Sequence, residues 1–234
     1  MALTISRLDG GPRLILEDAP AVALAFFEWD QGSLRFDEHA AAGDEPDRFT
    51  RDDLRAVNTL AARSAEKAWA DVLGRELPEL HRLDRAWDLT GLDEAAWAEA
   101  SPAVEAAFEL FIAPYRGLAV AAKALHLKRP RLFPILDSLV VDILGGRGRA
   151  PLDLMDRVRS IGRQNDDALA EVQQVLRRHG FERSKVRILD ALLWSMHPAA
   201  AIAPRLGRLV ARVSWRSPTA RRIVNGPLPP ERAT

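Results

Sequence analysis

Cysteine is absent from the 234-residue sequence. This absence excludes disulfide bonds, thiolate catalysis and cysteine-based zinc sites. Tyrosine is nearly absent as well, because Tyr115 is the single example. Since strands are rich in β-branched and aromatic residues, this composition favours helix over sheet. We expect a mostly α fold, a multi-helix bundle of roughly nine helices around one core, with room for one minor strand near the N-terminus.

Long apolar runs are also missing. No stretch approaches about 20 uninterrupted apolar residues, so no membrane span is expected. The start, MALTISRLDGG, lacks the apolar run of a signal peptide, and we therefore expect a cytoplasmic protein. The five histidines are scattered without HxxxH or HxH spacing, and no GxSxG, Walker-type or GxGxxG motif occurs. We therefore expect neither a metal site nor a cofactor.

Charge is balanced overall but unevenly distributed. The formal net charge is +0, which gives no global attraction to nucleic acid or membrane. Residues 202–234 are rich in arginine, with Glu231 as their one acidic residue, whereas residues 28–53 are acidic. Such asymmetry is typical of a nucleic-acid-binding tail or of two parts of a chain that pack together. It also allows the basic tail to bind an acidic protein partner.

Glycine and proline mark only soft divisions of the chain. We interpret residues 1–216 as a single helical domain, with soft boundaries near 44–48 and 145–151. Residues 217–234 form a Pro- and Arg-rich tail for which we expect no stable order. The short apolar run within residues 1–20 fits either a strand or the lead-in to a helix.

Caps and periodicity predict the helices. Thr50 predicts the start of an amphipathic helix that runs to a stop at Gly74. The acidic, glycine-containing residues 30–48 predict a surface loop. Ser101 followed by Pro102 predicts the start of another helix. Further helices are predicted over 21–29, 115–127, 134–144, 152–163, 165–179, 183–196 and 199–213.

The segment 115–144 combines a turn, a cationic cluster and a lone carboxylate. Gly117 in the turn is free to adopt a backbone conformation closed to other residues, and the following helix would then present free N–H groups to an anion. Lys128, Arg129 and Arg131 form a basic loop of the kind that positions phosphates. The alternatives are an ordinary helix stop and a solvated loop.

Asp137 and Lys123 are the candidate catalytic residues. As an N-cap, Asp137 satisfies a free backbone N–H. As a functional group, it stabilises positive charge in a transition state or orients water in a cation-lined groove. Lys123 either reaches a substrate or extends to solvent. His126, inside an apolar helix, fits a hydrogen-bonded and partly buried residue better than a base.

Two resemblances involve these residues. The segments 47–60, 121–144 and 184–197 resemble an uncharacterised bacterial family, a domain of unknown function. YRGLAVAAKALHL followed by FPILDSLVVDIL is similar to the helix-hairpin-helix core of base-excision DNA glycosylases. In the adenine-mismatch branch of that family, a Gly-rich hairpin precedes a Phe-Pro-Ile-Leu-Asp step whose aspartate is catalytic.

The glycosylase resemblance implies that Asp137 matches the catalytic aspartate and Gly117 the first hairpin glycine. The second hairpin glycine is Ala119 here, and the lysine of bifunctional members falls on Ala121, two residues from Lys123. The cysteines that bind an iron–sulfur cluster in some members are absent. The resemblance implies DNA as a partner. The residues expected to contact it are Arg116, Gly117, Lys128, Arg129 and Arg131.

Two main hypotheses stay open. In the first, the chain binds nucleic acid, and Asp137 stabilises an oxocarbenium-like sugar after the base is flipped out. In the second, the chain is a non-catalytic interaction protein, and its tail docks on an acidic partner or on residues 28–53. The second hypothesis places four tryptophans in the core: Trp69, Trp87, Trp97 and Trp194. A third class, a small-molecule enzyme using Asp137 and His126, rests on their proximity.

Overall fold

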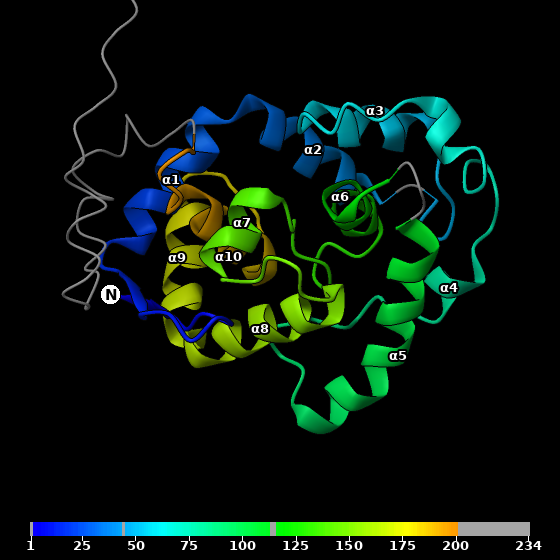
Figure 1. Cartoon of the computed structure of the whole chain (residues 1–234). Helices are drawn as coiled ribbons and strands as arrows, with labels where there is room; N and C mark the ends of the chain where they lie inside the picture. Colours follow the sequence, from blue (N-terminus) through cyan, green and yellow to red (C-terminus); the bar gives the residue numbers. More distant parts are fainter. Residues whose placement is uncertain (1, 44, 113–115, 201–234) are drawn as a thin grey trace, which may run out of the picture.

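The structure, a computed structural model, describes residues 2–43, 45–112 and 116–200. Within these ranges the chain is mostly helical, with ten α-helices, one 3-10 helix and a two-stranded sheet near the N-terminus (Figure 1). The mostly α class and the minor N-terminal strand are therefore confirmed. The predicted tail, and all but the first two residues of the helix predicted over 199–213, lie outside the described residues.

The two strands form an antiparallel hairpin. Strand β1 (Leu3–Ile5) pairs with β2 (Leu14–Leu16), and Leu3 lies opposite Leu16. The helices follow in chain order as α1 (Ala19–Trp29), α2 (Gln31–Ala42), α3 (Arg51–Thr59), η1 (Glu66–Trp69), α4 (Pro78–His81), α5 (Glu94–Phe111), α6 (Leu118–Lys128), α7 (Ser138–Ile143), α8 (Pro151–Gln164), α9 (Asp166–Arg178) and α10 (Lys185–Ser195).

Helix α10 lies within one group of helices and packs against α1, α7, α8 and α9 (Figure 1). All of its residues except Lys185 and Trp194 are buried, and these include the charged Arg187 and Asp190. Helix α6 belongs to a second group and packs against α2, α3 and α5. The contacts of α1 with α2 and of α5 with α8 join the two groups.

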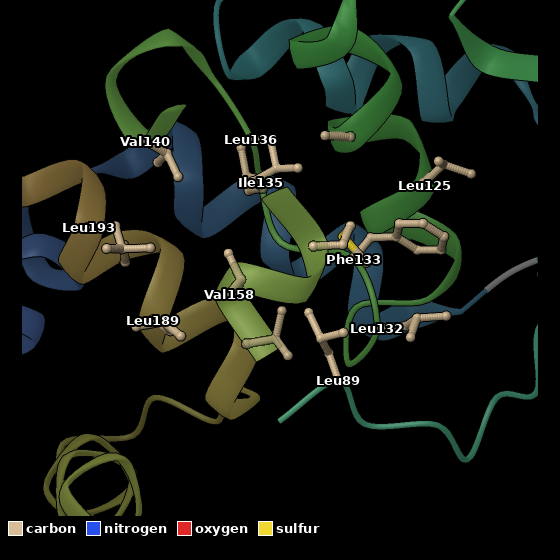
Figure 2. Packing of buried hydrophobic residues seen from close by; sticks show 14 of the residues in the cluster. Leu89, Leu125, Leu132, Phe133, Ile135, Leu136, Val140, Val158, Leu189 and Leu193 are labelled. Carbon is tan, nitrogen blue, oxygen red and sulfur yellow. The ribbon is translucent and has the colours of Figure 1, made fainter. Parts of the chain in front are cut away.

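An extended segment, residues 133–136, crosses the core between α6 and α7. Figure 2 shows Phe133 beside Leu125 of α6, and in this view Val158 of α8 lies between Phe133 and Leu189 of α10. The helix predicted over 134–144 therefore begins only at Ser138. Pro134 disfavours helical dihedrals at Phe133, and Asp137 caps the helix so that it begins at Ser138.

Buried side chains satisfy the backbone of this segment. The Nδ1–H of His126 donates to the Phe133 carbonyl at 2.6 Å, since a carbonyl oxygen can only accept. The Ile135 N–H donates to Asp190 Oδ2 at 3.0 Å. Burial, reinforced by the charge of Arg187, lowers the pKa of His126 to about 4. The prediction of His126 as a hydrogen-bonded, buried residue is confirmed, and the side chain is more deeply buried than expected, at 1% exposure.

Three further predicted element boundaries are wrong, and the first concerns residues 30–48. Helix α2 occupies most of this range. Asp30 caps it by accepting from the N–H groups of Gly32 and Ser33, and Gly43 ends it with a φ of 65°. The acidic residue and the glycine that suggested a loop are therefore a helix cap and a helix stop.

The second and third errors concern helix lengths. The helix that begins at Thr50 has the predicted cap, but it ends at Thr59 instead of near Gly74. Helix α5 begins at Glu94 and continues through Pro102, where a new helix was predicted. Its apolar face, which includes Trp97, is buried on both sides of the proline. Packing therefore outweighs the one backbone hydrogen bond that proline removes.

We expect His126 to make the protein less stable in acid. As the pH falls from 6.5 to about 4, unfolded His126 takes up a proton while the folded residue stays neutral. The free energy of unfolding should therefore fall by about 3 kcal/mol over this range, at about 1.4 kcal/mol per pKa unit. In His126→Asn, whose amide keeps a donor for the Phe133 carbonyl, this share of the pH dependence should vanish. Urea unfolding of both proteins across this pH range measures it, and parallel pH profiles would contradict the assignment.

Candidate functional site

A pocket opens between α1, α6, α7 and α10, beside the end of α3. Its volume is about 220 Å³. The rings of Phe26, Trp29 and Trp194 form apolar parts of its wall, while Lys123 and Asp137 supply polar groups. We call it the Lys123–Asp137 pocket. The structure thus brings the two predicted catalytic residues to one cavity, although they come from different helices.

The two carboxylate oxygens of Asp137 differ in their hydrogen bonds. Its Oδ1 accepts hydrogen bonds from the backbone N–H groups of Leu139 and Val140, both at 3.0 Å, so the predicted N-cap is confirmed. The side chain is only half-buried. Within the described ranges, no protein group donates a hydrogen bond to Oδ2. A ligand in the pocket therefore has a firmly held carboxylate with a vacant acceptor oxygen.

Lys123 is a buried amine. The residue is 6% exposed, so its side chain does not extend to solvent. Its Nζ donates to the Leu60 carbonyl at 2.7 Å, and none of the described carboxylates lies within ion-pair distance. Burial lowers the pKa of Lys123 below its usual 10.5, and the charge of Asp137 opposes this shift. Buried lysines with a lowered pKa occur at catalytic sites, where they act as bases, acids or nucleophiles.

The Leu60 carbonyl reaches Lys123 because α3 stops early. Ala61 and Arg63 have positive φ values of 56° and 49°, which end the helix. The Asn58 side chain holds the turn by accepting from the Ser64 N–H at 2.8 Å and donating to the Ser64 carbonyl at 3.0 Å. Positive φ costs free energy in residues with a Cβ, and such strain is concentrated at functional sites. The strained turn directs a carbonyl at the lysine.

A chain of buried charges lies behind the pocket. Arg187 donates to Asp190 Oδ1 and, at 2.8 Å, to Asp37 Oδ1. The Nε of Arg183 lies 2.8 Å from Asp37 Oδ2. Burial raises the pKa of Asp190 to about 7, against the opposing effect of the Arg187 guanidinium. Because Asp190 also holds Ile135, these ion pairs fix the segment that leads to Asp137.

The predicted nucleic-acid contacts lie mostly inside the protein. Arg116 is 1% exposed, forms a bidentate pair with Asp71 at 2.6 and 2.8 Å, and donates to main-chain carbonyls. Gly117 is exposed, but its φ of −76° is open to any residue, so the expected special conformation is wrong. Residues 113–115 of the predicted hairpin lie outside the described residues. The helix-hairpin-helix core therefore stays a prediction.

The basic loop after α6 is largely committed to internal contacts. Lys128 is buried and pairs with Asp53 at 2.8 Å. Arg129 is also buried, pairs with Asp47 at 2.6 Å, and donates to the carbonyls of Leu80, Leu83 and Pro46. Arg131 alone among these three cations is exposed, with 57% of its side chain accessible. The expected open cationic groove is not formed by these three residues.

Sequence reasoning missed several residues of the pocket. Trp194 was assigned to the core, together with Trp69, Trp87 and Trp97. Trp69 and Trp97 are buried, whereas Trp87 is partly buried and Trp194 lines the pocket. Arg187 and Asp190 were also missed. A signal was present, because two opposite charges three residues apart in an otherwise apolar helix indicate a buried ion pair.

Comparison with known proteins gives a family but no activity. Residues 29–197 match DUF6308, which is described as a family of unknown function. Comparisons with curated proteins and with solved structures gave no significant match. Over the ranges described by the structure, no three acidic or histidine side chains are placed to hold a metal ion. None of the described helices has the length and apolar character to cross a membrane.

We expect Arg129→Met and Arg131→Met to differ sharply in stability. Arg129→Met leaves the carbonyls of Leu80, Leu83 and Pro46 without this donor and removes one of the partners of half-buried Asp47, which Arg85 still pairs, so it should lower the free energy of unfolding by about 3 kcal/mol. Arg131→Met changes an exposed residue and should have an effect within about 0.5 kcal/mol. Urea denaturation of the two variants measures the difference. Similar effects would show that Arg129 is not the internal link described above.

We also expect the charge of Asp137 to control Lys123. Since the Asp137 carboxylate raises the pKa of Lys123, Asp137→Asn should lower that pKa further below its usual value. Asp93→Asn is the matched control, because Asp93 also caps a helix but does not line the pocket. An NMR titration of ¹⁵N-labelled lysine side chains reports the Lys123 pKa in each protein. Equal values in the two variants would show that Asp137 and Lys123 do not interact.

Proposed function

Because the chain belongs to DUF6308, a family of unknown function, we propose an activity from the Lys123–Asp137 pocket, namely hydrolysis of an N-glycosidic bond in a nucleic-acid or nucleoside substrate. The observation that carries the proposal is the uncommitted Oδ2 of Asp137 in the same aromatic-walled pocket as the buried Lys123 amine. The similarity of residues 115–144 to base-excision glycosylases supports the same chemistry.

The two polar groups suit the two halves of this reaction. As the bond from sugar to base breaks, its electron pair goes to the base nitrogen and positive charge develops on the sugar. Asp137 stabilises that charge through Oδ2, while its Oδ1 stays anchored to backbone amides. Lys123 donates a proton to the leaving base and recovers one from the water that adds to the sugar.

The apolar walls suit a planar base. Phe26, Trp29 and Trp194 contribute rings to the pocket, and aromatic faces bind nucleobases by stacking. Trp29 and Trp194 are only partly buried, so they border the opening. DNA is the partner implied by the sequence resemblance. Arg116, Lys128 and Arg129 form internal ion pairs and so do not support DNA binding. The support for DNA as a partner is therefore the pocket.

A second candidate is the non-catalytic interaction module. One observation favours it, namely that cations expected to hold a nucleic-acid strand instead join distant parts of the chain, as Arg129 joins residues 46–47 to 80–83. In this candidate Asp137 is a helix cap alone. An acidic protein would then bind the arginine-rich residues 202–234, which lie outside the described part of the chain.

Base release decides between the candidates. We expect the wild-type protein to release a base from at least one member of a panel of duplex DNAs with and without lesions, single strands and free nucleosides. Asp137→Asn should slow release by at least about 100-fold, because the developing positive charge loses its carboxylate. Chromatography of the freed bases measures the rate.

Two controls make the result specific. Asparagine is also a good N-cap, so Asp137→Asn should keep its fold, and urea unfolding checks this. Asp93→Asn makes the same change at the cap of α5 and should leave the rate unchanged. No release from any substrate, or equal rates in the wild type and Asp137→Asn, would overturn the glycosidic proposal.

A further inference from the structure

A second cavity lies between α2, α9 and the start of α10. Its volume is about 750 Å³, within the range of small-molecule sites. Arg183, Lys185 and Arg187 contribute to its wall, and Arg177 and Arg131 extend this basic wall. We call it the Arg183 cavity. Arg187 also lines the Lys123–Asp137 pocket, so the two cavities share this residue.

Two guanidinium groups in this wall have unused donors. The Nη2 atoms of Arg183 and Arg187 are buried and have no hydrogen-bond partner, whereas the Nε atom of Arg183 lies against Asp37 Oδ2. Only 5% of the Arg187 side chain and 11% of the Arg183 side chain are exposed. Leaving a buried donor unsatisfied costs free energy, and more when the donor is charged, so such groups point to a missing partner.

Both guanidinium groups are held in place by aromatic rings. The Arg183 guanidinium carbon lies 5.2 Å from the centre of the Phe27 ring, and that of Arg187 lies 5.5 Å from the same ring. Phe181 and Phe26 add further contacts at 5.9 and 5.4 Å. A ligand would therefore meet donors that are already ordered, which reduces the entropic cost of binding.

The carboxylates of the cavity are already engaged. Asp88 lies 3.2 Å from Arg131, Asp166 lies 2.5 Å from Lys185, and Glu182 lies 3.9 Å from Arg177. Among the described residues that line the cavity, this leaves Asp37 to be shared by Arg183 and Arg187. Asp190, the second partner of Arg187, belongs to the wall of the other pocket.

The start of α10 adds backbone donors to the same wall. Ser184 caps the helix by accepting from the Arg187 N–H at 3.1 Å, and both Ser184 and Lys185 line the cavity. The first N–H groups of a helix have no intrahelical acceptor, and the helix dipole makes this end favourable for anions. The N-terminal end of α10 therefore lies beside the two guanidinium groups.

From this arrangement we propose that the Arg183 cavity binds a phosphate group, as inorganic phosphate or as the terminal phosphate of a small phosphorylated molecule. Arg183 and Arg187 donate through their free Nη2 atoms, and the start of α10 donates through its backbone. The planar guanidinium presents parallel N–H groups that match phosphate oxygens. This site is independent of the glycosidic activity proposed for the other pocket.

Calorimetric titration of the full chain tests the proposal, with inorganic phosphate, ribose 5-phosphate and uncharged ribose as probes. We expect both phosphates, but not ribose, to bind the wild type. Arg183→Gln should weaken binding by at least about tenfold. Arg178→Gln is the matched control, because Arg178 is an exposed arginine on the neighbouring α9 that does not line the cavity. It should bind like the wild type.

Arg183→Lys tests whether phosphate binding needs the planar guanidinium group or only a positive charge. It keeps one positive charge but loses the planar fork, so it should bind more weakly than the wild type even though it is as charged. This variant also carries the test if circular dichroism shows that Arg183→Gln is unfolded. Equal affinity in the Arg183 variants and in Arg178→Gln would overturn the site. Absence of phosphate binding to the wild type would do the same and would assign the free donors to water.

Discussion

The extended segment 133–136 imposes the constraint on which the rest of the core depends. Its side chains are buried, so its backbone cannot reach solvent, and each buried N–H and C=O needs a protein partner. His126 and Asp190 provide two of these partners. Asp190 is in turn a buried carboxylate that requires a cation, and Arg187 meets this need. One non-helical crossing thus accounts for the buried Asp190 and for the Arg187 that pairs with it.

The same crossing shapes the Lys123–Asp137 pocket. Helix α6 carries Lys123, and the chain then turns, passes through the core and emerges at Asp137, where α7 begins. The two side chains therefore belong to one continuous connection whose ends are fixed. The Leu60 carbonyl approaches from a third direction, because the strained turn at Ala61 ends α3 early. Helix α6, the extended segment and the turn after α3 together place Lys123 and Asp137 at one cavity.

Local features of the structure could be predicted from the sequence, and long-range ones could not. The caps at Thr50 and Asp137 were predicted because a cap depends on the next three residues. The burial of Arg116, Lys128 and Arg129 was missed because their partners lie 45, 75 and 82 residues away. A basic stretch looks the same in a sequence whether its charges face solvent or distant carboxylates.

The missed turn after Thr59 has a related cause. The apolar spacing of residues 50–73 is compatible with a longer helix, and no glycine marks the break. The break comes from Asn58, whose side chain holds Ser64, and from two non-glycine residues at positive φ. Such strain persists only where surrounding contacts maintain it, and those contacts are tertiary. The hydrogen bond from Lys123 to the Leu60 carbonyl therefore could not be predicted from the local sequence.

Asp137 and Lys123 carry unequal weight as evidence of function. The structure accounts for Asp137 without any activity, because its Oδ1 caps α7 and its other oxygen is partly open to solvent. Lys123 has no comparable structural role that would explain its presence. Its burial costs free energy, and the single hydrogen bond to Leu60 returns only part of it. An apolar residue at this position would avoid that cost, so the amine indicates a role in the pocket more strongly than the aspartate does.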